Sequence, residues 1–582
     1  MRGDTVEPIV VSTVWHTMQT VCREMIHVID RTAQNYLIGQ LHDLSVGIWT
    51  ASGDTVAVPE GLPVHFLSGD VVIKELMEIF KDDLSPGDVI LSNDPYRSQN
   101  VHLPDWGFFR PIFLDGEPVF WVMSRGHQQD SGGSFPGGYF PDAYDIHAEG
   151  IIIPPIKVYK AGKERRDVLQ LILNNTRWPE GIRLDNYAMM AALEWAERRL
   201  VTLLRRYGKD CVLECVNQML DRTEQAVREQ IRRIPDGTYY GESATDDDGT
   251  EQGVPVWIRV EMTVRGDEIT FDFSKSDSQR KGFVNTVYAS TRAATMGAAV
   301  LFLDPALAGY HNQGSLRPIQ VVAPPGLVVN CQYPATVGAS PVSMCVQVME
   351  AVLQAFNAAS PESVAAWERP RGDYTFGTDP RSSQRYVRVL FDYYGSAGAV
   401  RGYDGYPGKV SSLTTMGAVR RGSIEEEEIR TPWRILHYEC ETDLMGAGRW
   451  RGGPGVRWEA INEGGDARIA TGNSDGDVTR PFALLPAEAP RPSRSYIRRN
   501  GEEIRVIARR MTAIQQGDVW IKLSSGGGGV GDPAERAPAL VAEDARDGIV
   551  SLKEARQTYK VVIRPDTWEV DEEQTRLLRA GA

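Results

Sequence analysis

The segment Val89–Asp130 reads VILSNDPYRSQNVHLPDWGFFRPIFLDGEPVFWVMSRGHQQD, and its pattern sets the fold expected around it. The apolar run Val89–Leu91 predicts a short strand. Phe108–Phe113 and Pro118–Ser124, joined by an Asp-Gly turn, predict a strand pair. Between these strands, residues 93–105 are polar and include two prolines, which predicts a loop. Loops held by a rigid scaffold are where binding groups concentrate, so these polar residues are the first candidates for function.

Two polar loops in this segment each carry a histidine with an aspartate three positions later. The two motifs are His102-Leu103-Pro104-Asp105 and His127-Gln128-Gln129-Asp130. Imidazole and carboxylate groups suit zinc, manganese or iron. If the strands Val89–Leu91 and Val119–Met123 are neighbours, the loops that follow them leave one edge of a sheet and can meet around one ion. Ordinary loop histidines also produce such matches in a chain of 582 residues, so the residues alone leave both explanations open.

The rest of the chain predicts a mixed α/β (α+β), multi-domain fold. Apolar residues at helical spacing predict helices over 14–35, 71–80, 186–207 and 211–234, whereas strands are expected over 44–51 and 55–58. Beyond residue 372 glycine becomes frequent and helical periodicity fades. A chain of this length exceeds one hydrophobic core. We therefore expect an α/β metal-site region with long helices over 1–235, a mixed α/β region over 236–370, and a glycine-rich, mainly β region over 371–582.

Composition excludes several classes of partner and location. The net charge of −15, without a basic stripe, argues against nucleic acid. No run approaches eighteen apolar residues, so no membrane span is expected. The first sixteen residues lack the pattern of a signal peptide, and the six cysteines are thinly spread. Reduced thiols and a cytoplasmic location follow as expectations.

Other histidines and charge clusters have simpler explanations. His65 stands in the apolar stretch Leu62–Gly69, where a hydrogen-bonded core histidine is commoner than a ligand. The acidic run Glu425–Glu428 cannot converge on one ion from a strand or a helix, so we expect a solvated loop. The chain also lacks the His-Glu-Xaa-Xaa-His motif of zinc proteases and the Gly-Lys-Ser/Thr ending of a phosphate-binding P-loop.

The candidate loops belong to an ordered series of short motifs that runs nearly from end to end of the chain. The series comprises Asp43-Leu44-Ser45, Pro63-Val64-His65, Gly87-Asp88-Val89, Asn93-Asp94-Pro95-Tyr96, the two histidine motifs with Ser131-Gly132-Gly133, Glu149-Gly150, Ile153-Pro154-Pro155, Arg449-Trp450-Arg451-Gly452-Gly453 and Gly527–Pro533. With these motifs the chain resembles the hydantoinase B and oxoprolinase family, which includes subunits of hydantoinases, 5-oxoprolinases, caprolactamase, and acetone and acetophenone carboxylases. It departs from the family at Arg97-Ser98-Gln99-Asn100, which replaces a glycine-rich stretch, and at Ser131, where an aliphatic residue is common; substrate identity is therefore open.

The resemblance implies a site and a division of labour. Asp43, His102, Asp105 and His127 match the positions that bind a divalent metal in the family, commonly manganese or zinc. A larger partner of the hydantoinase A type would bind ATP and Mg, and the two chains would form a hetero-oligomer. In this hypothesis a metal-bound hydroxide opens an activated cyclic amide, and Asp130 is either general base or orienter of the His127 imidazole.

Three functions stay open from the sequence. The first is ATP-dependent hydrolysis of a hydantoin, oxoproline or lactam ring. The second is carboxylation of a ketone, in which the same ion polarises an enolate or a carboxyl donor. The third, from another class, is a noncatalytic scaffold that stabilises the ATP-binding partner.

Overall fold

The computed structural model describes residues 6–58, 61–303, 309–360, 366–367, 373–390, 396–407, 422–471, 476–484 and 486–580. Two compact units divide this part of the chain. The first unit contains most of the chain up to Glu242 together with Ile258–Ala355, and the second contains Ser243–Trp257 and most of the chain from Phe356 onward. Helices and several separate sheets occur together, which confirms the predicted mixed α/β, multi-domain class. The division into three regions stays a prediction, and its boundary at 370 lies outside the described residues.

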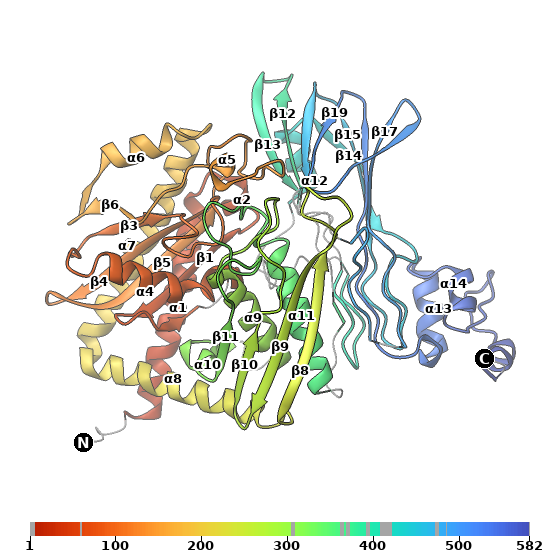
Figure 1. The fold of residues 1–582 in the computed structure, drawn as a ribbon, viewed down its shortest axis with the longest axis horizontal. Helices are drawn as coiled ribbons and strands as arrows, with labels where there is room; N and C mark the ends of the chain where they lie inside the picture. The colour runs from red at the N-terminus through yellow and green to blue at the C-terminus, as the bar shows by residue number, and fades with distance from the viewer. Residues whose placement is uncertain are drawn as a thin grey trace. The chain divides into compact units, whose positions relative to one another are not determined.

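The first unit is built on a seven-stranded sheet with strand order β2-β1-β5-β4-β3-β6-β7 (Figure 1). Every neighbouring pair is antiparallel. This order places β5 between β1 and β4, so β5 has a hydrogen-bonded neighbour along both edges. The strands are β1 (Leu44–Thr50), β2 (Thr55–Ala57), β3 (Val89–Ser92), β4 (Asp105–Leu114), β5 (Glu117–His127), β6 (Ile156–Lys160) and β7 (Lys163–Glu164).

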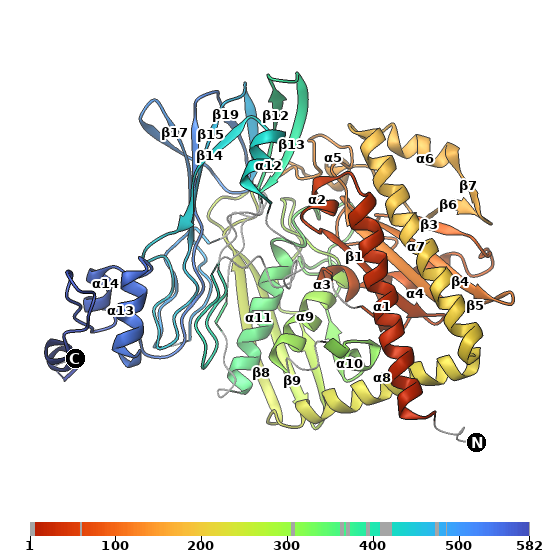
Figure 2. The same ribbon diagram turned by 180° about the vertical axis from the view of Figure 1, so that it is seen from behind.

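Both faces of this sheet are buried, as the alternation along β5 shows. Phe120 and Val122 belong to the core formed with three long helices, α1 (Pro8–Thr32), α7 (Pro179–Tyr207) and α8 (Lys209–Ile231), and Figure 2 shows α1 and α7 lying across the sheet. Trp121 and Met123 point the other way, into a smaller core with α4 (Gly69–Ile79). Successive strand residues face opposite sides, so β5 is fixed by packing on both faces.

Further elements complete the first unit. A four-stranded sheet of order β11-β10-β9-β8 follows the long helices in sequence. Strand β8 ends and strand β9 begins within Ser243–Trp257, which are assigned to the second unit. The elements are α2 (Tyr36–Gly39), α3 (Pro63–Phe66), α5 (Ile146–Glu149), α6 (Arg166–Leu173), β8 (Gly237–Thr245), β9 (Val256–Arg265), β10 (Glu268–Asp272), α9 (Tyr288–Phe302), α10 (Gln313–Leu316), β11 (Ile319–Val322) and α11 (Met344–Ala359). Among the described helices, none combines the length and apolar character needed to cross a bilayer.

The second unit is mainly β, as expected for the C-terminal part of the chain. It holds a four-stranded sheet, β13-β12-β16-β19, and a five-stranded sheet, β14-β15-β20-β17-β18. Its elements are β12 (Asp373–Asp379), β13 (Gln384–Leu390), α12 (Ile424–Arg430), β14 (Trp433–Cys440), β15 (Val456–Asn462), β16 (Ala467–Thr471), β17 (Arg494–Arg499), β18 (Glu502–Arg505), β19 (Met511–Ile514), β20 (Val519–Leu523), α13 (Pro538–Arg546), α14 (Leu552–Gln557) and α15 (Glu572–Ala580).

The loop predicted for the acidic run Glu425–Glu428 is wrong, because these residues form helix α12. Ser423 caps the helix by accepting a hydrogen bond from the Glu426 amide at 3.3 Å, and acidic side chains in a first turn are stabilised by the helix dipole. Glu427 is buried and pairs with Arg388. The run therefore serves helix formation and packing.

Candidate metal centre

The candidate site lies where β4 begins and β5 ends. Asp105 is the first residue of β4 and His127 is the last residue of β5, and the antiparallel register places the two directly opposite each other. The condition under which the loops are expected to meet, that Val89–Leu91 and Val119–Met123 are neighbours, does not hold, because β4 lies between β3 and β5. The predicted pairing of 108–113 with 118–124 is confirmed. The tight turn at residues 115–116 makes β4 and β5 neighbours. The first histidine loop joins β3 to β4, so it leads directly into the start of β4, where Asp105 lies.

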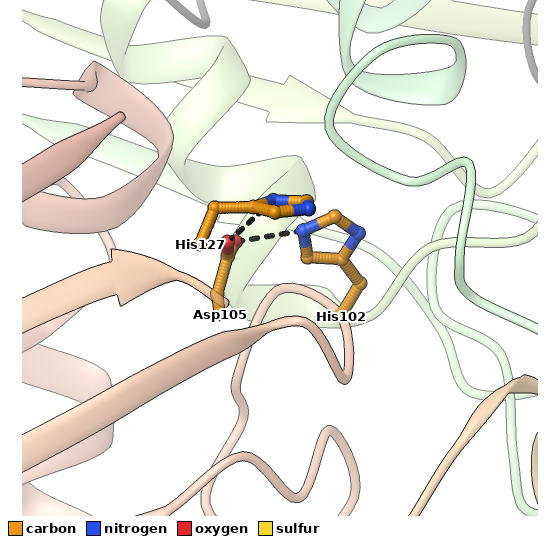
Figure 3. Close-up of side chains that lie close together, drawn as sticks. All are labelled: His102, Asp105 and His127. Carbon is orange, nitrogen blue, oxygen red and sulfur yellow. Dashed lines mark ion pairs between the residues drawn. The ribbon is translucent and has the colours of Figure 1, made fainter. Parts of the chain in front are cut away.

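His102, Asp105 and His127 converge on one another (Figure 3). The Nε2 atom of His102 lies 3.0 Å from Oδ2 of Asp105, and Nδ1 of His127 lies 3.2 Å from Oδ1 of the same carboxylate. The two imidazole centroids are 5.1 Å apart with an interplanar angle of 62°. All three side chains are buried. One ligand atom from each lies within 4.8 Å of the others, a spacing at which they could hold one ion.

Asp43 joins this cluster from the neighbouring strand. It precedes β1, whose pairing with β5 sets Leu44 opposite Gly126, and its backbone carbonyl accepts a hydrogen bond from the His127 amide at 3.1 Å. Its Oδ2 lies 3.8 Å from Nδ1 of His127. Its buried Oδ1 has no hydrogen-bond partner among the described residues. Burying a carboxylate oxygen without a hydrogen-bond partner costs free energy unless a cation binds it. This set of donor atoms therefore fits a divalent ion.

His65, interpreted above as a core histidine, also contacts this cluster. Its Nε2 lies 2.8 Å from Oδ2 of Asp105, and its Nδ1 lies 3.2 Å from Oγ of Ser45. Ligand atoms of Asp43, His65 and Asp105 form a second group within 4.8 Å. His65 lies in helix α3, 40 positions before Asp105 in the sequence, and no motif spacing links it to either histidine loop. The motif Pro63-Val64-His65 was the one sequence feature that could have identified it.

Burial and mutual charge shift the pKa values of the cluster. Burial raises the pKa of Asp43 to about 6, with His127 opposing and Asp105 adding to that rise. Burial also acts to raise the pKa of Asp105, but the charges of His102 and His65 and the hydrogen bonds from His102 and His127 hold it well below its usual range. Burial acts to lower the pKa of His102, and Asp105 more than reverses this effect. The positive charge beside these carboxylates is therefore supplied by bound protons, and a divalent cation could take the place of those protons.

Side-chain amides fix the two loops. The Nδ2 group of Asn100 donates to the carbonyl oxygens of Asn93, His102 and Asp105 at 3.2, 2.9 and 2.8 Å. Nδ2 of Asn35 donates to the His127 carbonyl at 2.9 Å. Asn100 belongs to the stretch that departs from the family's glycine-rich pattern. Its three hydrogen bonds hold the backbone of this loop next to His102 and Asp105.

Asp130, the second aspartate of the paired motifs, is engaged away from Asp105. Its Oδ1 accepts hydrogen bonds from the Gly137 amide at 3.1 Å and from Nη1 of Arg177 at 3.0 Å, and its Oδ2 accepts from the Arg177 amide at 2.8 Å. Arg177 also donates to the carbonyls of Gly132 and Gly133. Asp130 therefore holds the glycine-rich loop that follows His127.

A distant segment completes the surroundings of His102. The Gly338 carbonyl lies 2.9 Å from Nδ1 of His102, a contact that spans 236 positions of the chain. The ring of Tyr139 meets the His102 ring edge to face, with centroids 5.8 Å apart. Glu149 is buried behind Gly338, and burial raises its pKa to about 8. Sequence reasoning assigned no role to Tyr139, Glu149 or Gly338.

Fold and site together define a mixed α/β protein that carries a buried histidine and carboxylate cluster suited to a divalent metal. The family model described as Hydantoinase B/oxoprolinase matches residues 7–533. The chain belongs to this family, which confirms the resemblance found in the sequence.

Relatives and solved structures support the same placement. The chain is 32% identical to the caprolactamase subunit beta of Pseudomonas jessenii over 594 residues, covering 99% of this chain and 100% of the relative. The crystal structure of ATP-dependent caprolactamase from Pseudomonas jessenii matches with a TM-score of 0.90 and 31% identity, over 99% of this chain and 100% of that chain. A nucleotide-free acetone carboxylase structure matches with a TM-score of 0.87 at 20% identity, over 99% and 83% of the two chains, which shows a shared fold.

Proposed function

We propose that this chain is the metal-binding subunit of a two-component, ATP-dependent amidohydrolase that opens a hydantoin, oxoproline or lactam ring. The observation that carries the proposal is the convergence of Asp43, His102, Asp105 and His127 in one buried cluster. It is supported by 32% identity over the full length of a caprolactamase subunit beta.

The four residues would hold manganese or zinc, since both accept imidazole and carboxylate ligands. Such an ion, when bound, lowers the pKa of water and polarises a carbonyl oxygen. His102 and His127 would bind through neutral nitrogens, while Asp43 and Asp105 would balance the charge. Asp130 would orient the loop after His127, consistent with its bonds to Arg177 and Gly137; a role as general base is the alternative.

His65 would orient Asp105 through one tautomer. Oδ2 of Asp105 can only accept, so Nε2 of His65, 2.8 Å away, must carry the proton. Nδ1 then accepts from the Ser45 hydroxyl, which itself accepts from the Leu62 amide at 2.9 Å. A histidine that donates to a ligating carboxylate fixes its direction and charge.

The partner would be a hydantoinase A type subunit that binds ATP and Mg, giving a cytoplasmic hetero-oligomer. Support comes from the relative, which is named as one subunit of a caprolactamase, and from the crystallised caprolactamase, which is described as ATP-dependent. This chain has no P-loop sequence of its own. Phosphoryl transfer to an amide oxygen would activate a poor electrophile before hydrolysis.

A test is to co-purify the chain with its ATP-binding partner and to follow ATP consumption with hydantoins, lactams, and ketones plus labelled bicarbonate. We expect ATP consumption coupled to a ring-opened product. Incorporation of label would instead establish the carboxylase alternative, to which the acetone carboxylase likeness contributes only the fold. Unchanged turnover in His102→Ala would establish the scaffold alternative.

A further inference from the structure

Glu149 is a buried acid whose hydrogen bonds go to backbone amides. It is the last residue of α5 and only 1% exposed. Its Oε1 accepts from the Gly338 amide at 2.9 Å, and the Val337 amide lies 3.1 Å from both carboxylate oxygens. Two consecutive peptide N–H groups thus point at one side chain. This arrangement sets the orientation of the backbone around residue 338.

The same residue, Gly338, contacts the candidate metal centre through its other backbone group. Its carbonyl oxygen lies 2.9 Å from Nδ1 of His102. Glu149, the backbone of Gly338 and His102 therefore form one hydrogen-bonded chain. A Cβ atom at residue 338 would lie 2.5 Å from the Phe283 ring and 3.1 Å from Oε1 of Glu149. The close approach of the Phe283 ring therefore favours glycine at this position, and Glu149 adds to the crowding.

The contact to the carbonyl selects the tautomer of His102. A carbonyl oxygen only accepts hydrogen bonds, so Nδ1 must carry a proton. Nε2, which lies 3.0 Å from Oδ2 of Asp105, then also faces an acceptor and donates to it while no ion is bound. Because the Gly338 carbonyl keeps the proton on Nδ1, Nε2 is the nitrogen whose proton a metal ion would displace. A rotated peptide at residue 338 would remove the carbonyl and permit the other tautomer, in which Nε2 cannot bind an ion.

Local anchoring keeps α5 in place independently of Glu149. Asp145 caps the helix by accepting from the amides of His147 and Ala148, and the Ile146 amide donates to the Pro334 carbonyl at 3.0 Å. The segment around Glu149 is thus already attached to the segment that contains Gly338. The carboxylate itself adds the bonds that fix the two peptide units before the Cα atom of Gly338, next to the peptide whose carbonyl meets His102.

We infer that Glu149 is a positioning residue that holds the Gly338 carbonyl on Nδ1 of His102 and so presents Nε2 to the metal. This inference rests on the proposed metal site. Residues that hold a ligating histidine through its second nitrogen change metal affinity by about 10–100-fold when removed. Glu149 acts on the second nitrogen of His102 indirectly, through the backbone of Gly338.

The test measures binding of Zn²⁺ and Mn²⁺ alone to the purified full chain by chelator competition. Glu149→Leu should weaken binding by about 10–100-fold. Glu149→Gln should stay within about threefold of wild type, because one amide oxygen can accept from both backbone N–H groups. The matched control is Asp246→Asn in the second unit, since Asp246 is also buried and accepts from backbone amides at residues 477–479. It should bind like wild type.

A second measurement separates positioning from simple loss of structure. Bound Co²⁺ should show altered visible absorption in Glu149→Leu but not in Glu149→Gln or Asp246→Asn. If Glu149→Leu does not fold, Glu149→Asp serves instead, because its shorter side chain loses reach to the amides and should also weaken binding. Wild-type affinity in folded Glu149→Leu or Glu149→Asp would overturn the inference. Wild-type protein that binds neither ion would overturn the proposed metal site as well.

Discussion

The two histidine-aspartate loops share one sequence pattern and use it differently. In the first loop both His102 and Asp105 face the cluster, whereas in the second only His127 does. Asp105 lies within β4 opposite His127, but Asp130 lies beyond the end of β5, where Arg177 and Gly137 bind its carboxylate. The position of a side chain relative to the end of its strand, more than the motif, decides whether it can serve a site.

The largest expected difference between the loops is in metal retention. Asp105→Asn removes the negative charge that contacts His65, His102 and His127, so metal affinity should fall by more than about 100-fold, beyond the usual effect of outer residues. Asp130→Asn should retain the ion. Metal analysis of both purified proteins checks this, and a metal-loaded Asp105→Asn would break the contrast.

The pH dependence of metal binding sharpens the contrast. A ligand must lose its proton to bind an ion, and Asp105 raises the pKa of His102 above its ordinary value. Affinity should therefore fall about tenfold for each pH unit as pH drops through that pKa. It should fall more steeply below the pKa of Asp43, which burial raises to about 6. Chelator competition from pH 5 to 8 measures the slope, and Asp130→Asn should show the same profile; a flat profile in wild type would contradict the assignment.

The smallest expected effect concerns stability, and it falls on the second loop. Asp130→Asn or Arg177→Met removes a charged hydrogen bond whose arginine is partly exposed, so the free energy of unfolding should fall by about 1–2 kcal/mol. The double variant should cost less than the sum of the two, because both remove one interaction. Urea unfolding followed by tryptophan fluorescence gives these values. Strict additivity would show that the pair does not hold the loop.

The sequence predicts the elements of the first unit and the pairing across its short turns well, and the pairing of strands distant in sequence poorly. The apolar spacing of α1 and of the hairpin β1–β2 is local information, and the structure confirms both. The turn at 115–116 predicts β4 as one neighbour of β5, but the other neighbour is β1, about seventy residues earlier in the chain, and no periodicity encodes that choice. The helix at 424–430 shows the same limit on a smaller scale, since its stability depends on a cap at Ser423 and on Arg388, far along the chain.

The candidate ligands could be named from motifs, whereas the residues that support them could not. His102 and His127 stand out as histidines in polar loops. His65 and Gly338 lie 40 and 236 positions from their partners, so only the fold reveals their contacts. Glu149 was visible within a family motif, but its purpose depends on the backbone at residues 337–338.

The central place of β5 links assembly of the centre to correct folding. His127 ends this strand, and the two flanking strands bring Asp43 and Asp105 to the same end through a register that also buries Trp121 and Met123. A slip of one residue would turn the imidazole to the opposite face and move Trp121 into the core that Phe120 and Val122 occupy. A copy in the wrong register would therefore lack this cluster, and binding of an added metal ion would test whether the sheet has formed in its native register.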